Sequence, residues 1–247
     1  MQETASSLEN ICIKYTPDEE ACLLDAVRAC FGEISTILRE VASPEISPDS
    51  RGELWVDLCV CPPTQARPYY TVVTCGMGAQ PMPVPHDMQE FDRAELVFML
   101  PEDWNINGRD ESSCWPLHWL RLLARLPREE ESWLGWGHTI PNGEPFAENT
   151  RLSSILLLDA HVPEGEQSAG EDAGVFLLSG GQPVRFYQCF ALYDEELDDL
   201  LEYGVQALLE RFSAAGMLSP VLDSAREHLF LREKTEQIGR ASCRERV

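Results

Sequence analysis

The segment WLGWGHTIPNGEPFAENTR, residues 133–151, holds the side chains that are best suited to chemistry. His138 follows a glycine and lies close in sequence to tryptophans and glutamates, and histidine is the usual general base near neutral pH. A hydrolase would also need a nucleophile and a group that orients the imidazole. Cys114 or Ser153 could act as the nucleophile and Glu144 could orient the ring. A small hydrolase or ligand-binding enzyme that uses His138 is therefore one hypothesis.

A surface that binds another protein is the second interpretation of the same segment. Aromatic anchors within an acidic rim are typical of a site for a basic partner. The candidate partner-binding residues are Trp133, Trp136, His138, Glu144, Phe146 and Glu148. Under this interpretation His138 hydrogen-bonds backbone groups that an irregular loop leaves unpaired. The segment is then a packed connector that offers its rim to a partner, although Trp and Phe side chains are mostly buried in proteins.

Known catalytic motifs are missing from the sequence. It contains no G-x-G-x-x-G, no P-loop, no G-x-S-x-G nucleophile elbow and no H-E-x-x-H zinc pattern. CGMGAQ, around Gly76 and Gly78, is only a fragment of a phosphate-binding loop, and no helix is expected after it. We therefore expect no catalytic residues, no enzymatic activity and no cofactor.

The nine cysteines do not form a metal-binding pattern. None lie in C-x-x-C, and Cys59 and Cys61 are two apart in an extended run, on one face of a strand. We expect free thiols in a reducing compartment and no metal site. The start, MQETASSLEN, lacks the basic and apolar regions of a signal peptide, and no apolar run approaches the roughly 20 residues of a membrane span. These features predict a cytoplasmic protein.

The formal net charge of −23 arises from 19 Lys and Arg residues against 42 Asp and Glu residues. Such a surface repels phosphate backbones and anionic bilayers, so we expect neither nucleic-acid binding nor membrane binding. It favours a basic protein partner, whose approach it would accelerate. The alternative is that the acidity only keeps the protein soluble.

Hydrophobic periodicity predicts the elements that position these residues. Thr16, Pro17 and Glu19 form a capping box at the start of a helix that should run to about Glu40. Residues 53–61 read as a strand with an apolar and a mixed face. Further strands are expected at 69–74, 93–100, 152–158, 175–178 and 184–193, and helices at 115–126 and 195–212. The last helix should bury Leu197, Leu200, Leu201, Leu208 and Phe212 and expose its carboxylates.

This order of elements predicts an α+β (mixed α/β) fold, a single domain with a central mixed or antiparallel sheet covered by helices. The domain should span residues 16–212, after an N-terminal segment 1–15 and before a C-terminal extension 213–237. The end, IGRASCRERV, residues 238–247, reads like the translation of a sequencing adapter, so we expect it not to be native. A structural alternative is a scaffold that self-associates through a sheet edge.

Five stretches, taken in order, carry a family resemblance. They are ELWVDLCVCPPTQARPYYTVVTCGMGAQPMPVP, RAELVFMLPEDW, WPLHWLRLLARLP, WLGWGHTIPNGEPF and RFYQCFALYDEELDDLLEYG. Together they resemble the suppressor of fused (Sufu)-like domain over residues 16–212. The resemblance implies the fold of the N-terminal domain of the animal protein, a cytoplasmic negative regulator of Hedgehog signalling. That protein binds Gli-type transcription factors by holding a short peptide strand between two domains.

The length of the chain is closer to that of the bacterial stand-alone members of this family. Some of these resemble immunity proteins of polymorphic toxin systems, and neither branch is known as an enzyme. GHTIPN resembles the Gly-His-Ile-Pro loop of the animal domain, for which the family gives no catalytic role. The resemblance therefore implies a non-enzymatic protein-binding module and, through the bacterial members, an immunity protein that neutralises a toxin.

Overall fold

The structure, a computed structural model, describes residues 12–40, 53–162 and 174–230. Its main sheet contains β2 (Thr36–Leu38), β4 (Asp57–Cys61), β5 (Tyr69–Cys75), β6 (Ala94–Pro101), β7 (Thr139–Pro141), β8 (Ser154–Asp159), β9 (Val175–Leu177) and β10 (Pro183–Leu192). β1 (Cys12–Ile13) and β3 (Glu53–Leu54) form a separate parallel pair. The helices are α1 (Pro17–Phe31), α2 (Glu111–Glu129), α3 (Asp194–Tyr203) and α4 (Val205–Ala214), with 3-10 helices η1 (Met77–Ala79) and η2 (His86–Phe91).

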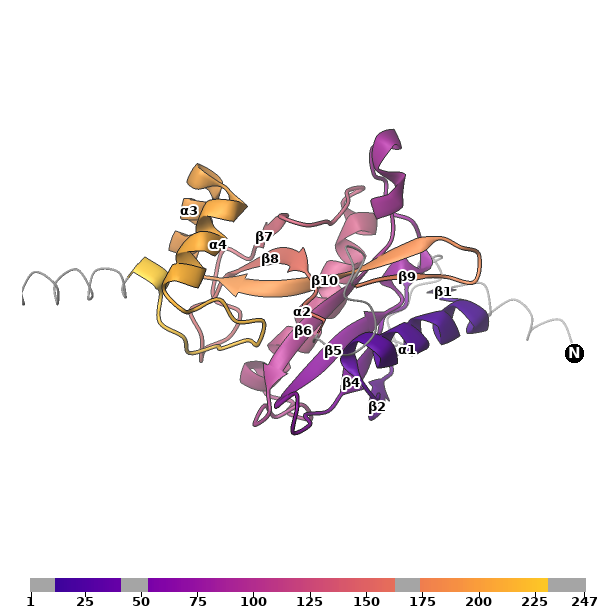
Figure 1. Ribbon diagram of the computed structural model, residues 1–247, viewed down its shortest axis with the longest axis horizontal. Helices are drawn as coiled ribbons and strands as arrows, with labels where there is room; N and C mark the ends of the chain where they lie inside the picture. The colour runs from indigo at the N-terminus through magenta and orange to yellow at the C-terminus, as the bar shows by residue number, and fades with distance from the viewer. Residues whose placement is uncertain (1–11, 41–52, 163–173, 231–247) are drawn as a thin grey trace, which may run out of the picture.

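The strand order across the eight-stranded sheet is β2-β4-β5-β6-β10-β8-β7, and β9 pairs with β10 beside this path (Figure 1). β6 and β10 run parallel, whereas the other neighbouring pairs of this sheet are antiparallel. The sheet is therefore mixed and mainly antiparallel. The predicted fold class is confirmed.

Helices cover both faces of the sheet, and the alternation of residues along β4 explains why. Leu58 and Val60 belong to a core cluster that includes residues of α2, while Cys59 and Cys61 belong to a second cluster with residues of α1. Successive side chains of a strand point to opposite faces, so α1 and α2 must lie on opposite sides. Both faces of β4 are buried.

β10 joins the two ends of the molecule. Val184 and Phe186 pack in the α1 cluster, whereas Phe190 and Leu192 pack in a third cluster with α3 and α4. All four side chains share one face because they are an even number of residues apart. α1 and the α3–α4 pair therefore cover the same face toward opposite ends of β10, as Figure 1 shows.

The predicted start of the first helix is confirmed and its predicted end is wrong. The Thr16 side chain accepts from the Glu19 N–H, and Glu19 reaches back to the Thr16 N–H, which completes the capping box. The helix ends at Phe31 because Gly32 adopts φ 89°, which ends the helical run. The chain then forms β2, so the apolar residue Leu38 belongs to a strand.

The predicted helix at 195–212 is two helices. Gly204 adopts φ 88° and separates α3 from α4, which changes the face that each residue presents. Leu201, expected to be buried, is 68% exposed, whereas the carboxylate of Glu196 is fully buried. The predicted strand at 53–61 is likewise interrupted, between β3 and β4.

The residues after α4 pack on the sheet. The Leu222 N–H donates to the Met99 carbonyl over 2.8 Å, and the side chain of Leu229 is fully buried in the α3–α4 cluster. The predicted adapter-like segment 238–247 lies outside the described residues, as do most of the N-terminal segment 1–15 and the last residues of the extension.

Candidate partner-binding site

The candidate segment 133–151 contains β7, in a region expected to be irregular. β7 pairs with β8 and forms the last strand of the main sheet path. The Asn142 N–H donates to the Ser153 carbonyl and Ile140 pairs with Ile155, so the backbone groups of Thr139 face away from β8. Within the described ranges, the outer side of β7 has no neighbouring strand. The segment therefore presents an open sheet edge.

Trp133 and His138 brace the turn before β7. Their rings lie 4.3 Å apart between centroids, and His138 Nδ1 lies 3.2 Å from the Trp133 carbonyl oxygen. The His138 N–H donates to the Gly135 carbonyl over 3.1 Å. The ring contact with the Trp133 carbonyl is the kind of side-chain bond to the backbone expected of His138, and it fits a structural role.

Trp136 is 48% exposed and is the large aromatic side chain that this turn presents to solvent. Its neighbour Gly137 has φ 80°, and a side-chain carbon there would lie 3.5 Å from Val205 Cγ2. The turn therefore lies against the start of α4, as Figure 1 also shows. Leu201 and Tyr203, at the end of α3, are also exposed. The sequence pattern misses these two because it predicts a continuous helix through Gly204.

Phe146 lies in the core and not on a surface that a partner could reach. Its ring stacks on Trp115 with centroids 4.8 Å apart and an interplanar angle of 9°, and it meets the edge of Trp119 at 4.8 Å. Only 4% of Phe146 is exposed. Its inclusion among partner-contacting residues is therefore corrected: it anchors the far end of the segment to α2.

Glu144 and Glu148 are exposed on the part of the segment between β7 and the end at Arg151. The Asn142 side-chain amide donates to the Glu144 carbonyl over 2.7 Å, and Gly143 adopts φ 81° in the turn. This turn fixes the backbone while the two carboxylates remain in solvent. The candidate residues thus divide into a bracing pair, an exposed aromatic, two exposed acids and one buried anchor.

The groups considered for hydrolysis are not brought together. His138 pairs with Leu157 of β8. Ser153, directly before β8, is four residues from Leu157, and four residues of extended chain span roughly 13 Å. The buried Ser153 hydroxyl donates to the Asp194 carboxylate. Cys114 lies in the first turn of α2, with its thiol near the Glu111 carbonyl, and Glu144 faces solvent. None of the proposed nucleophiles therefore lies within hydrogen-bond reach of His138 in this structure.

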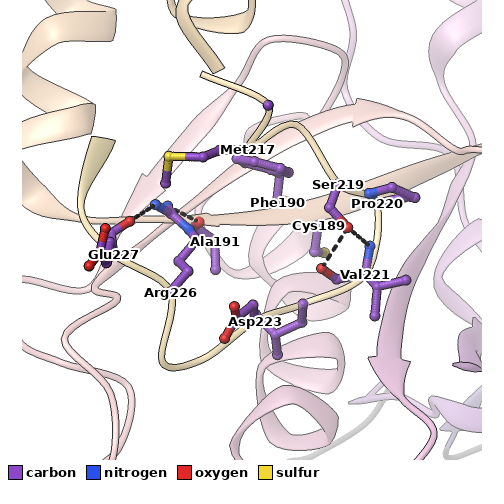
Figure 2. A pocket seen from close by; sticks show the side chains of 12 residues that line it. Cys189, Phe190, Ala191, Met217, Ser219, Pro220, Val221, Asp223, Arg226 and Glu227 are labelled. Atoms are coloured by element: carbon purple, nitrogen blue, oxygen red, sulfur yellow. Dashed lines mark hydrogen bonds between the residues drawn. The ribbon is translucent and has the colours of Figure 1, made fainter. Parts of the chain in front are cut away.

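A cavity of about 400 Å³ lies between β10 and the segment after α4 (Figure 2). Arg226 crosses beside it and donates to the Ala191 carbonyl over 3.0 Å. The same guanidinium makes a two-pronged ion pair with the fully buried Glu196. Burial raises the pKa of the Cys189 thiol on the cavity wall, so this thiol is protonated at neutral pH. Arg226 is therefore committed to the fold, whereas Asp223 and Glu227, which also line the cavity, are exposed.

The part of the chain that the structure describes can be searched for metal-binding clusters and for membrane-spanning helices. There, no group of three or more His, Cys, Asp or Glu side chains is placed to hold a metal ion. No helix in those ranges has the length and apolar character that a bilayer crossing needs.

These features define a mixed α/β domain whose candidate site is an open strand edge and its flanking loop. The family model for suppressor of fused protein (SUFU) matches residues 52–227. This chain belongs to that family. An uncharacterized protein of Ureaplasma parvum serovar 3 is 27% identical over 199 residues, which is 81% of this chain and 90% of the relative.

Solved structures show the same fold. A SUFU homolog from Neisseria gonorrhoeae FA 1090 has a TM-score of 0.57 at 16% identity and covers 86% of this chain and 97% of its own. A chain of the Sufu–Fu complex has a TM-score of 0.56 at 14% identity, covering 87% and 94%. Drosophila Suppressor of Fused has a TM-score of 0.57 at 13% identity. It covers 92% of this chain, which spans about half (54%) of the Drosophila chain.

Proposed function

We propose that this chain is a non-enzymatic, cytoplasmic protein-binding module whose partner docks at the outer edge of β7. The open edge carries the proposal, because the outward-facing N–H and C=O groups of Thr139 and the C=O group of Pro141 can pair with a short added strand, and Trp136 beside them supplies an anchor. A chain of similar fold is found in the Sufu–Fu complex, which supports a protein as the ligand. His138 holds the turn and performs no chemistry in this proposal.

The partner is a basic protein. Glu144 and Glu148 are exposed next to the edge, and the chain as a whole carries a net charge of −23. A basic surface approaching this edge would be attracted from a distance and would meet acidic side chains at the rim. The same charge opposes nucleic acids and anionic membranes.

Neutralisation of a bacterial toxin is the specific role that we propose for this binding. Relatives in Ureaplasma parvum and Neisseria gonorrhoeae support a bacterial setting. Co-expression tests this role: a toxin recovered as the partner should arrest growth alone and not with this chain. Growth arrest that persists in the presence of the full chain would contradict the role while leaving protein binding intact.

Replacing Trp136 by alanine should weaken binding of the recovered partner by about 30-fold, because removal of a central aromatic anchor costs about 2 kcal/mol. The melting temperature should change by less than about 1 °C, because the side chain is half exposed and outside the core clusters. Affinity is measured by titration calorimetry with partner captured by the tagged full chain.

Leu177→Ala is the matched control, because Leu177 is 61% exposed on β9 and lies outside the candidate segment. It should leave the affinity unchanged. Equal losses in the two variants would show that β7 does not form the interface.

The double variant Glu144→Gln with Glu148→Gln should slow association with the partner and flatten the dependence of the association rate on salt.

A further inference from the structure

An open groove lies between the end of α2 and the proline-rich segment after β5. Its volume is about 770 Å³. Its apolar lining is formed by Leu54, Met77, Met82, Val84, Ala124 and Pro127. Met77 and Met82 are nearly buried, at 2% and 6% exposure, so their thioethers form part of the floor. Methionine adapts its shape to different side chains and is common on surfaces that bind amphipathic helices.

The proline-rich wall of this groove cannot extend a sheet. Pro81 and Pro83 have no N–H group. The N–H groups between and after them are used inside the segment: Met82 donates to Asp92 over 2.7 Å and Val84 donates to Met82 over 2.9 Å. An extended peptide would therefore find no ladder along this wall, which favours an occupant whose own backbone is already paired, as in a helix.

The rim of the groove is acidic. Glu131, an exposed residue directly after the α2 cap, and Asp92, on the opposite wall, both line the groove. Arg128 is the basic side chain among the lining residues, and its guanidinium is bonded to Gln80 over 2.5 Å. Asp92, Glu131 and Arg128 together leave a net charge of −1 around an apolar floor, which complements a segment with basic and apolar faces.

Glu131 occupies a backbone position that favours glycine. Among the described residues, Glu131 is the one non-glycine residue with a positive φ, which is 46°. It directly follows Glu130, the C-cap of α2. The Ser132 N–H donates to the Pro127 carbonyl over 2.9 Å, which is the closing bond of a Schellman ending. Glycine is usual at this position because other residues are strained there. A glutamate that costs stability at the rim of a groove suggests that its charge serves binding.

We propose that this groove docks a basic amphipathic helix of a protein partner, with the apolar face on the methionine floor and cationic side chains against Glu131 and Asp92. The inference rests on the proposed function only in that a protein supplies the helix. The groove is lined by residues other than those of β7, so each surface can be disabled while the other is intact.

The probe is a labelled synthetic helix of about 18 residues with leucines on one face and lysines on the other. A peptide of the same composition in scrambled order reports attraction by charge alone. For the full chain, we expect the amphipathic peptide to bind at least about 10-fold more tightly than the scrambled one. Fluorescence anisotropy gives both dissociation constants.

Two groove variants separate apolar docking from charge. Val84→Asp adds a negative charge, yet it should remove the roughly 10-fold preference for the amphipathic peptide over the scrambled one, because it places a carboxylate in the apolar lining. Glu131→Gly should weaken binding about 3-fold and raise the melting temperature by about 2–3 °C, because it loses a rim charge and relieves strain. Glu33→Gln, an exposed acid after α1 and hence on the side of the sheet opposite α2, should change neither.

Equal affinity for the two peptides would overturn the proposal, as would an unchanged preference in Val84→Asp with its fold intact by circular dichroism. Conversion of a dimer to a monomer by Val84→Asp in sedimentation would also overturn it, by assigning the groove to a second copy. Trp136→Ala should leave the peptide affinity unchanged. Failure at β7 and failure at the groove are therefore distinguishable.

Discussion

Replacing Arg226 by alanine is expected to lower the free energy of unfolding by about 3–5 kcal/mol, because one partner of a buried ion pair is removed. Glu196 is fully buried, and Arg226 Nη1 lies 2.7 Å from its Oε1. The guanidinium also lies over the rings of Tyr193 and Phe212, at 4.9 and 5.1 Å from their centroids. Alanine leaves the carboxylate without its cation and removes these ring contacts. Urea denaturation followed by tryptophan fluorescence measures the change.

Two further variants test this explanation. Arg151→Ala removes an exposed pair, in which Arg151 and Glu195 are 3.7 Å apart, and should cost less than about 0.5 kcal/mol. The double variant Arg226→Met with Glu196→Gln should recover part of the loss, because glutamine still accepts the Leu229 N–H without a buried charge, whereas its NH2 group cannot accept the Tyr193 N–H. A loss below about 1 kcal/mol in Arg226→Ala would contradict the assigned role.

Replacing Glu95 by glutamine is expected to stabilise the protein above pH 7, by up to about 3 kcal/mol at pH 8. Burial raises the pKa of the fully buried Glu95 to about 7, although Thr74, the N–H groups of Gly78 and Gly76, and Tyr15 oppose the shift by hydrogen bonding. Between the ordinary pKa near 4.5 and about 7 the folded state binds more protons than the unfolded state. Stability from this carboxyl group is therefore full below pH 4.5 and is lost as the pH rises through 7.

Glutamine keeps a neutral side chain of the same shape at every pH. The measurement is the difference in unfolding free energy between the two proteins from pH 5 to 8, because other titrating groups cancel in that difference. A difference that does not vary with pH would rule out this titration. Glu95→Ala should instead cost at least about 3 kcal/mol at pH 5, where the carboxyl group of the folded protein is protonated, because the Tyr15 hydroxyl and two backbone N–H groups lose their acceptor.

Patterns with a local cause could be predicted from the sequence. The capping box at Thr16 needs only four residues, and the alternation along β4 follows from the period of a strand. The breaks at Gly32 and Gly204 could not be predicted in this way, because apolar residues beyond each glycine keep a helical spacing by coincidence. A positive φ at glycine is set by the packing of the residues after it, and that packing is not local.

The candidate site was predictable in its position more than in its detail. The mixture of tryptophan, histidine and a Pro-Asn-Gly turn marked the segment, but pairing with β8 requires residues that come later in the chain. Exposure of Trp136 and burial of Phe146 depend on tertiary packing, in which the Trp115 ring of α2 covers Phe146. Glu95 did carry a signal: it shares a strand face with Val97 and Met99, where a carboxylate must be buried.

The place of β10 at the centre of the sheet has a consequence for synthesis on the ribosome. β6 is complete at Pro101, yet its neighbour β10 is complete only at Leu192. A nascent chain between these points carries an unprotected apolar strand, and parallel pairing across such a separation forms slowly. Premature release in this interval would leave an aggregation-prone edge, so we expect truncated chains that end before residue 183 to be insoluble and to bind chaperones.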